Sequence, residues 1–390
     1  MYLGRLLRYN IRTDQLAEVL PLKDYFMQKK AVLDSDTLVE LSGYMLEKRY
    51  APPGGDDDYL RPMITDVRSL LEKSVAQAGD VPESHYNYGK YFIYNGNYSS
   101  AIPSLKEAVR LFDEAQKMNP GRIIRNIDAC RLLGESYAAG AEYIPAGEIY
   151  AKGITMYQDS LESRTINPDI TGGLLYADIG DMDYFLSGNY NQALESYTNA
   201  VENLNDTDSV RYKMGCINYS FENYEEALNN FSRAYGENPD DKNLMYAMGN
   251  AFFLRGDYGA AQGYYTRLME KLETLRVQYG IVIPQVRVDH SEFVKMYMET
   301  ANNLGVTLYY LAGIGGDSEK NIRGIASLTE SLRAYDALTR NPDTMIRLSG
   351  SNLAEMNLKY MNFPDSGYKP GIYGDIALTL EGEEPLAAAE

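Results

Sequence analysis

A recurrence of 34 residues constrains the fold of this chain more than any other feature of its sequence. A fixed period in this range is typical of stacked helical or solenoid units, each of which buries its apolar face only against its neighbours. The period therefore predicts a repeat array rather than one compact core. Three columns of residues keep the step: Tyr190, Tyr224 and Tyr258; Ala193, Ala227 and Ala261; Tyr197, Phe231 and Tyr265.

The turns inside the period indicate two helices per unit. Gly188-Asn189 and Gly256-Asp257 lie between the apolar stretches. Glycine can take the left-handed conformation that ends a helix, and Asn or Asp then begins the next helix as an N-cap. Asn238-Pro239 follows the second stretch, where proline cannot continue a helix. We expect antiparallel helix pairs, named A and B below.

The pattern resembles the tetratricopeptide repeat, which has small residues at positions 8 and 20, aromatic residues at 11 and 24, and alanine at 27 of 34 residues. The third unit departs from it with Asp181 at position 8, and the sixth is looser, with Gly305 at position 8 and a lengthened A–B loop at Gly313–Asn321. The resemblance implies an all-α, right-handed α-solenoid of stacked antiparallel helix pairs. Five units carry it well: Gly89, Phe92, Ala101, Leu105 and Ala108; Gly134, Tyr137, Ala146, Tyr150 and Gly153; Tyr184, Ala193, Tyr197 and Ala200; Gly215, Ala227, Phe231, Ala234 and Pro239; Gly249, Phe252, Ala261 and Tyr265.

The same pattern divides the chain into four parts. Residues 1–81 are expected to form helices that include a degenerate repeat-like pair, and residues 82–342 the solenoid of about six units. Residues 343–361 are predicted to form an amphipathic helix that covers the end of the stack. Residues 362–390 contain Pro and Gly among Tyr, Ile and Leu, which leaves two alternatives open. They form either a disordered tail or an extended segment that packs on the solenoid or on a partner.

Charge and composition exclude several classes of function. The net charge is −18, which disfavours binding to nucleic acid and to anionic lipid. We expect no direct membrane insertion by this segment. The amphipathic start at Leu3, Leu6 and Leu7 lacks a signal-peptide core, and we expect the chain to be a piece of something longer.

No chemistry of an enzyme is marked out in the sequence. The two histidines, His85 and His290, and the two cysteines, Cys130 and Cys216, lie far apart and lack metal-ligand spacing. The acidic run Asp56–Asp58 is expected to be a solvated loop rather than a cation site. We therefore expect no catalytic residue, no metal and no cofactor.

The resemblance also places the residues that would bind a partner. In tetratricopeptide arrays helix A lines the concave face, and its positions 2, 5, 9, 12 and 13 point into it. The resulting groove is aromatic and weakly polar, so we expect a protein ligand, either a helix or an extended apolar segment of another subunit. Self-association stays open. The predicted groove residues are Tyr86, Lys90, Tyr94, Arg131, Phe185, Tyr212, Tyr219, Tyr246, Asn250, Phe253, Asn302 and Tyr309.

The expected function is a non-enzymatic protein-interaction scaffold. Tyr- and Asn-rich repeats with an acidic balance are similar in style to spirochaete tetratricopeptide proteins of the periplasmic flagellar motor collar, which favours the periplasm. The alternatives are a cytoplasmic adaptor or chaperone-like module for a soluble client, and a regulatory repeat domain of a longer enzyme.

Overall fold

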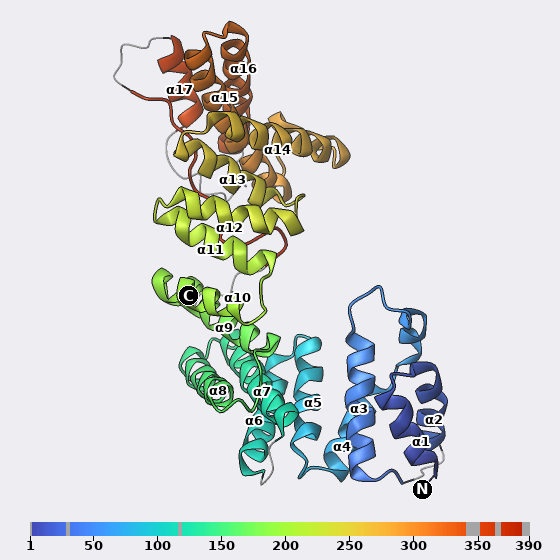
Figure 1. Cartoon of the computed structure of the whole chain (residues 1–390). Coiled ribbons are helices and arrows are strands. Elements are labelled where there is room, and N and C mark those ends of the chain that lie inside the picture. Colours follow the sequence, from blue (N-terminus) through green and yellow to red (C-terminus); the bar gives the residue numbers. More distant parts are fainter. Residues whose placement is uncertain (1, 29–31, 116–118, 341–351, 363–367, 384–390) are drawn as a thin grey trace. The chain divides into compact units, whose positions relative to one another are not determined.

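A computed structural model describes residues 2–28, 32–115, 119–340, 352–362 and 368–383. Throughout these residues the regular secondary structure is helical, and no strand occurs among them (Figure 1). The chain forms two compact units, unit 1 with Met1–Asn205 and unit 2 with Asp206–Pro385. The division between them falls inside the stretch 82–342 that the sequence pattern treats as one array.

Unit 1 is a succession of helices that pack on their neighbours in sequence. The first helices of successive pairs, α5, α7 and α9, also contact one another, so they form the inner layer, and their partners form the outer layer. The helices are α1 (Tyr2–Arg12), α2 (Leu16–Gln28), α3 (Ser35–Tyr50), α4 (Val67–Gln77), α5 (Pro82–Tyr94), α6 (Tyr98–Glu114), α7 (Pro120–Ala139), α8 (Tyr143–Glu162), α9 (Ile170–Met182) and α10 (Tyr190–Glu202), with a 3-10 segment η1 (Asp58–Met63) and a π-helical turn η2 (Asp183–Ser187).

Unit 2 repeats this arrangement with inner helices α11, α13, α15 and α17, each of which contacts the next. The predicted helix 343–361 is described only from residue 352 onward, because 343–351 lie outside the described residues. The helices are α11 (Asp208–Ser220), α12 (Tyr224–Glu237), α13 (Lys242–Arg255), α14 (Tyr258–Gln278), α15 (Ser291–Gly315), α16 (Ser318–Arg340) and α17 (Leu353–Asn362), with 3-10 segments η3 (Ile283–Gln285) and η4 (Val288–His290).

Close approach between helices A and B explains the small residues that recur at the period. A Cβ added to Gly215 would lie 2.4 Å from the ring of Phe231, and one added to Gly249 would lie 2.5 Å from the ring of Tyr265. Real Cβ atoms do not come so near, so only glycine lets these aromatic rings pack fully into the pair. Both rings are buried.

The pair formed by α9 and α10 corrects the position that the sequence pattern gave to Asp181 in the third repeat unit. Gly180, not Asp181, faces the aromatic ring, because a Cβ on Gly180 would lie 2.6 Å from Tyr197. Asp181 instead accepts a hydrogen bond from the Tyr197 hydroxyl at 2.6 Å. The helix therefore holds one residue more than the period allows, and the π-helical turn η2 absorbs it before the A–B turn at Gly188.

The predicted long loop at Gly313–Asn321 is wrong. α15 continues to Gly315 and α16 begins at Ser318, so helices occupy most of that stretch. Gly316 alone makes the reversal, with a φ of +63° that favours glycine. The last helix pair is thus longer than the others, with a connection as short as theirs.

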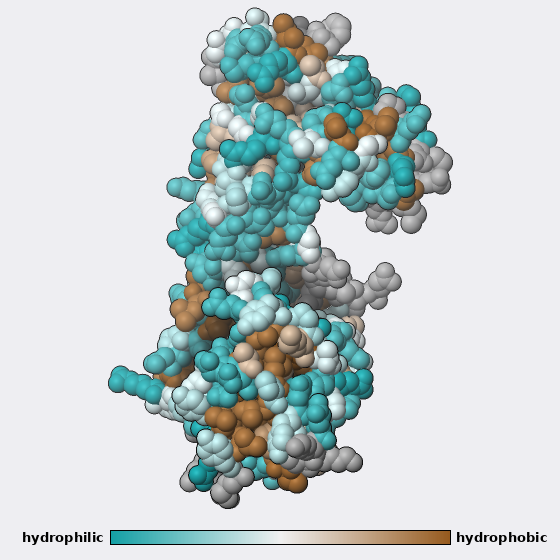
Figure 2. Space-filling model, turned by 90° about the vertical axis from the view of Figure 1, so that its right-hand side faces the viewer, coloured by the Kyte–Doolittle hydropathy of each residue, from teal (hydrophilic) through white to brown (hydrophobic). Residues whose placement is uncertain are grey.

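The C-terminal residues 368–383 are extended and lie against unit 2, where Figure 1 shows them in red running from α17 toward α11. Residues 363–367 and 384–390 of the predicted tail lie outside the described residues. None of the helices that the structure describes has the length and apolar character needed to cross a membrane. On the face shown in Figure 2, hydrophobic residues form separate patches on a mostly hydrophilic surface.

Candidate partner-binding surfaces

Unit 1 has a hollow on its inner helices. Tyr86, Lys90 and Tyr94 of α5 and Arg131 of α7 line one concavity of about 500 Å³, so the structure brings four predicted groove residues together. Tyr94 is 40% exposed and stacks on Tyr50 with ring centroids 4.8 Å apart. The hollow is therefore partly aromatic and open at Tyr94.

Charges dominate the floor of this hollow. Arg131 pairs with Asp128 at 2.9 Å and with Glu135 and Asp178 at 3.3 Å each. Burial raises the pKa of Asp178 to about 7, although the charge of Arg131 opposes the shift. Burial also raises the pKa of Glu135. One guanidinium is thus shared by three carboxylates, which is more polar than the groove that the sequence predicted.

Lys90 and Tyr86 complete the network. The Lys90 ammonium pairs with Glu47 at 2.6 Å and lies 5.6 Å from the ring centroids of both Tyr86 and Tyr94. The Tyr86 hydroxyl donates to Asp128 at 2.6 Å. Burial disfavours ionisation of Asp128, but Arg131, this hydrogen bond and Lys90 together lower its pKa. Tyr86 and Lys90 therefore stabilise the packing of unit 1 and also line its hollow.

Phe185, the fifth predicted groove residue of unit 1, is placed apart from these four. Its ring packs edge-on against Tyr184, with centroids 4.8 Å apart, next to the π-helical turn. It does not line the hollow. Because the prediction counted from the uninterrupted period, the extra residue of this helix moved its register.

Unit 2 has a groove along its own inner helices, and residues 368–383, called the tail below, lie in it. Five of the seven groove residues predicted for unit 2 donate hydrogen bonds to main-chain carbonyls of this tail. The bonds run from Tyr212 to Ala377 at 2.9 Å, from Tyr219 to Gly374 at 2.7 Å, from Tyr246 and Asn250 to Tyr373 at 3.0 Å each, and from Asn302 to Gly371 at 3.3 Å.

The other two predicted residues of unit 2 pack among aromatic rings. Phe253 lies edge-on to Tyr258 and Tyr310, with centroids 5.1 and 5.7 Å apart. Tyr309 lies edge-on to Tyr310 and Tyr360, at 5.9 and 6.3 Å. Both belong to the packing between α13, α15 and α17.

Sequence reasoning missed the residues that contact the tail most fully. Asn303 of α15 and Asn357 of α17 are fully buried, and each bonds to both the N–H and the C=O of one tail residue. Asn303 follows Asn302 by one position, outside the positions carried over from the family. α15 and α17 mix apolar and polar residues, so an asparagine there is no clear local signal, and only its burial shows that the amide requires polar partners.

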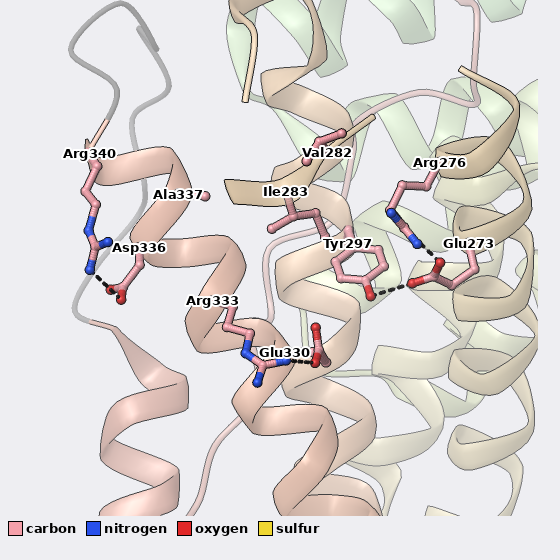
Figure 3. A pocket seen from close by; sticks show the side chains of 10 residues that line it. All are labelled: Glu273, Arg276, Val282, Ile283, Tyr297, Glu330, Arg333, Asp336, Ala337 and Arg340. Carbon is pink, nitrogen blue, oxygen red and sulfur yellow. Dashed lines mark hydrogen bonds and ion pairs between the residues drawn. The ribbon is translucent and has the colours of Figure 1, made fainter. Parts of the chain in front are cut away.

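A second hollow of unit 2, also of about 500 Å³, lies between α14, η3, α15 and α16 (Figure 3). Its charges are satisfied by near neighbours in the chain. Arg276 pairs with Glu273 at 2.8 Å and Arg340 with Asp336 at 3.3 Å, while Tyr297 donates to Glu273 at 2.6 Å. Such pairs between residues three or four positions apart stabilise the helices that carry them. Among the described residues no cluster of His, Cys, Asp and Glu could hold a metal ion.

The fold defines an α-helical repeat protein, and in unit 2 its inner helices bind an extended segment of the same chain. Residues 212–271, which span α11 to α14, match the tetratricopeptide-repeat family. This match supports the repeat type that the sequence pattern predicts, and such proteins generally act as interaction scaffolds. No curated protein matches the chain.

Three similar solved structures are helical repeat proteins of low identity. The quorum sensor NprR from B. thuringiensis, in its apo form, is 18% identical with a TM-score of 0.47, over 84% of this chain and 86% of that one. The C-terminal part of a TPR repeat-containing protein from Cytophaga hutchinsonii is 14% identical with a TM-score of 0.46, over 77% and 99%. PilF from Pseudomonas aeruginosa is 14% identical with a TM-score of 0.39, over 67% and 97%.

Proposed function

We propose that this chain is a non-enzymatic scaffold that binds protein partners through the inner surfaces of its helix pairs. One observation carries the proposal: inner-helix side chains of unit 2 hold an extended polypeptide by hydrogen bonds to its main chain. The inner surface is thus chemically suited to bind protein. The tail covers this surface in unit 2, so the hollow of unit 1 is the surface at which we expect a partner first.

The chemistry of the unit 1 hollow suits a polar or mixed ligand. Tyr94 offers an exposed ring, and Lys90 and Arg131 lie beside carboxylates. Aromatic and arginine side chains at the centre of a concavity are typical of binding surfaces. We place the first partner contact at Tyr94.

Photo-crosslinking tests this proposal. A photoreactive phenylalanine replaces Tyr94 in one variant and Ile144 in a matched control, since Ile144 is 79% exposed on the outer helix α8. We expect position 94 to capture a small set of proteins that position 144 does not. Equal capture at the two positions would contradict the assignment of the inner surface.

The cellular setting of such a scaffold rests on the sequence resemblance alone. A place in an envelope assembly such as a spirochaete flagellar motor collar is one proposal, and a cytoplasmic adaptor for a soluble client is the other. Crosslinking in separate envelope and cytosolic fractions distinguishes them. Envelope or motor proteins support the first, and soluble clients alone support the second.

A further inference from the structure

The tail occupies the inner groove of unit 2 along its whole length. Its start lies at α17 and α15, where Tyr310 donates to the carbonyl of Pro370 at 3.1 Å. Its end lies at the N-terminal ends of α13 and α11, where Asp241 accepts from the Glu381 N–H at 2.6 Å and Ser209 donates to Glu383 at 3.1 Å. The tail thus runs from α17 and α15 at its start to α13 and α11 at its end.

Two asparagines clamp the main chain of the tail at alternate residues. Asn357 accepts from the Gly371 N–H at 3.0 Å and donates to the Gly371 carbonyl at 2.9 Å. Asn303 does the same with Tyr373, at 2.8 and 2.9 Å. Residues two apart face the same side of an extended chain, so one helical surface can bind both. The two side-chain amides thus form the main-chain hydrogen bonds that a neighbouring strand would form in a β-sheet.

Side chains of α11 and α13 also bind the main chain of the tail. Hydroxyls and amides of Tyr219, Tyr212 and Asn243 donate to the carbonyls of residues 374, 377 and 379 of the tail. Main-chain contacts are independent of the ligand's side chains, as in other forms of extended-peptide recognition. These main-chain contacts require an extended segment that is free of proline at the two clamped positions.

Only a few tail side chains add selectivity. Tyr373 and Leu380 are buried, whereas Lys369 and Asp375 are exposed. Glu381 pairs with Lys242 at 2.7 Å. The pattern is an aromatic residue, an apolar residue seven positions later, and an acidic residue directly after it.

The buried clamps also indicate that the groove is not left empty. Asn303 and Asn357 are fully buried with the tail in place, and each amide would lose its two main-chain bonds to the tail without an extended ligand. Buried amides without partners are costly, so one ligand must be replaced by another of the same kind.

From this geometry we infer that the unit 2 groove is a main-chain-reading peptide site in which the tail is a resident ligand that exchanges with an extended partner segment. The partner segment carries an aromatic residue followed at seven and eight positions by an apolar and an acidic residue. This inference rests on the proposed scaffold function and names the kind of partner for unit 2.

Fluorescence anisotropy with a labelled peptide of residues 368–383 tests the exchange on the full chain. In wild type the attached tail competes at the high effective concentration of a tethered ligand. The Gly371→Pro/Tyr373→Ala variant removes one clamped N–H and the buried ring of the tail. We expect it to bind the probe at least tenfold more tightly than wild type. Gly371→Ala keeps the N–H and has open space for a Cβ, so it should bind as wild type does.

Adding Asn303→Leu to the tail variant should weaken the probe at least tenfold. A probe with Tyr373→Ala should also bind at least tenfold more weakly, whereas a probe with the exposed Lys369→Ala should bind unchanged. The inference would be overturned if a tail variant with intact helicity failed to bind the probe. It would also be overturned if Asn303→Leu left the probe affinity unchanged. A wild-type dimer that the probe disperses would overturn it too, because a second copy would then be the occupant.

A measurement on wild type keeps the test decisive if the tail variant does not fold. Saturating probe should speed hydrogen exchange at the tail amides of Gly371 and Tyr373, and unchanged exchange contradicts the exchange model. Crosslinking at Tyr94 in unit 1 reports on the scaffold function separately. Partners captured there without any probe binding would refute this inference alone.

Discussion

The side-chain amide of Asn303 forms two hydrogen bonds with the main chain of Tyr373, accepting from its N–H at 2.8 Å and donating to its carbonyl at 2.9 Å. The same amide donates to Asn250 at 2.9 Å, so it joins α15, α13 and the tail at one buried point. Asn303 and Tyr373 are separated by 70 positions along the chain, and the helical repeat alone gives no reason for their contact.

Replacing Asn303 by Leu should lower the free energy of unfolding by about 2–3 kcal/mol, because the buried Tyr373 N–H loses its acceptor while the side chain keeps its branched shape. Denaturant unfolding measures this change. Asn229→Leu on the exposed face of α12 is the matched control and should stay within about 0.5 kcal/mol of wild type. Equal effects of the two substitutions would show that the clamp does not form.

Tyr212 and Tyr246 are 0% and 3% exposed, so their replacement by Ala leaves cavities and should cost about 3–5 kcal/mol each. Phe keeps each ring and removes only the hydroxyl that donates to the tail, at about 1 kcal/mol each. Thermal unfolding gives the stability, and hydrogen exchange gives the protection of the tail. We expect Tyr→Phe to raise tail exchange while most stability is kept, and unchanged exchange would argue against these two bonds.

The register of the third pair can be tested at two adjacent residues. Gly180→Ala should destabilise by about 1–3 kcal/mol, because the added methyl meets the Tyr197 ring. Asp181→Ala should cost about 1 kcal/mol, since it loses one hydrogen bond with the Tyr197 hydroxyl. Gly147→Ala, in open space on α8, should stabilise by up to about 1 kcal/mol. A larger loss at Asp181 than at Gly180 would restore the register of the simple period.

Stability should depend on pH through Glu299. The pKa of Glu299 is raised from 4.5 to about 7, mainly by burial; Lys295 opposes the shift, and the charges of Asp375 in the tail and of Glu292 add to it. Tyr246 of α13 and Tyr373 of the tail also interact with this carboxyl. Because the folded-state pKa lies above the unfolded value, the contribution is complete below pH 4.5 and is lost as pH rises through about 7.

Unfolding measurements on wild type and Glu299→Gln from pH 4 to pH 9 check this expectation. The wild type should lose on the order of 2 kcal/mol relative to the variant over this range. The difference between the two proteins is needed because the pKa of Asp178 in unit 1 is also raised to about 7. Parallel curves for the two proteins would show that Glu299 titrates normally.

The repeat, the helix pairs and the placement of most of the predicted side chains on the inner helices could be predicted from the sequence because they depend on local patterns. Gly215 and Phe231 recur at the period, and their close packing follows from the geometry of two adjacent helices. Asp181 was placed wrongly because one inserted residue has no signature in the period itself. Only the π-helical turn after it reveals where the chain absorbs that residue.

The sequence by itself determined that this chain stacks antiparallel helices and presents tyrosines and asparagines on their inner layer, because a 34-residue period specifies which side chains face a neighbouring helix. The tertiary structure decided that five of those predicted side chains bind the chain's own tail. It also places Asn303 and Asn357 where their side-chain amides bind the main chain of the tail. The physical reason is that main-chain hydrogen bonds between distant segments carry no side-chain pattern, so only the folded path of the tail shows which amides meet it.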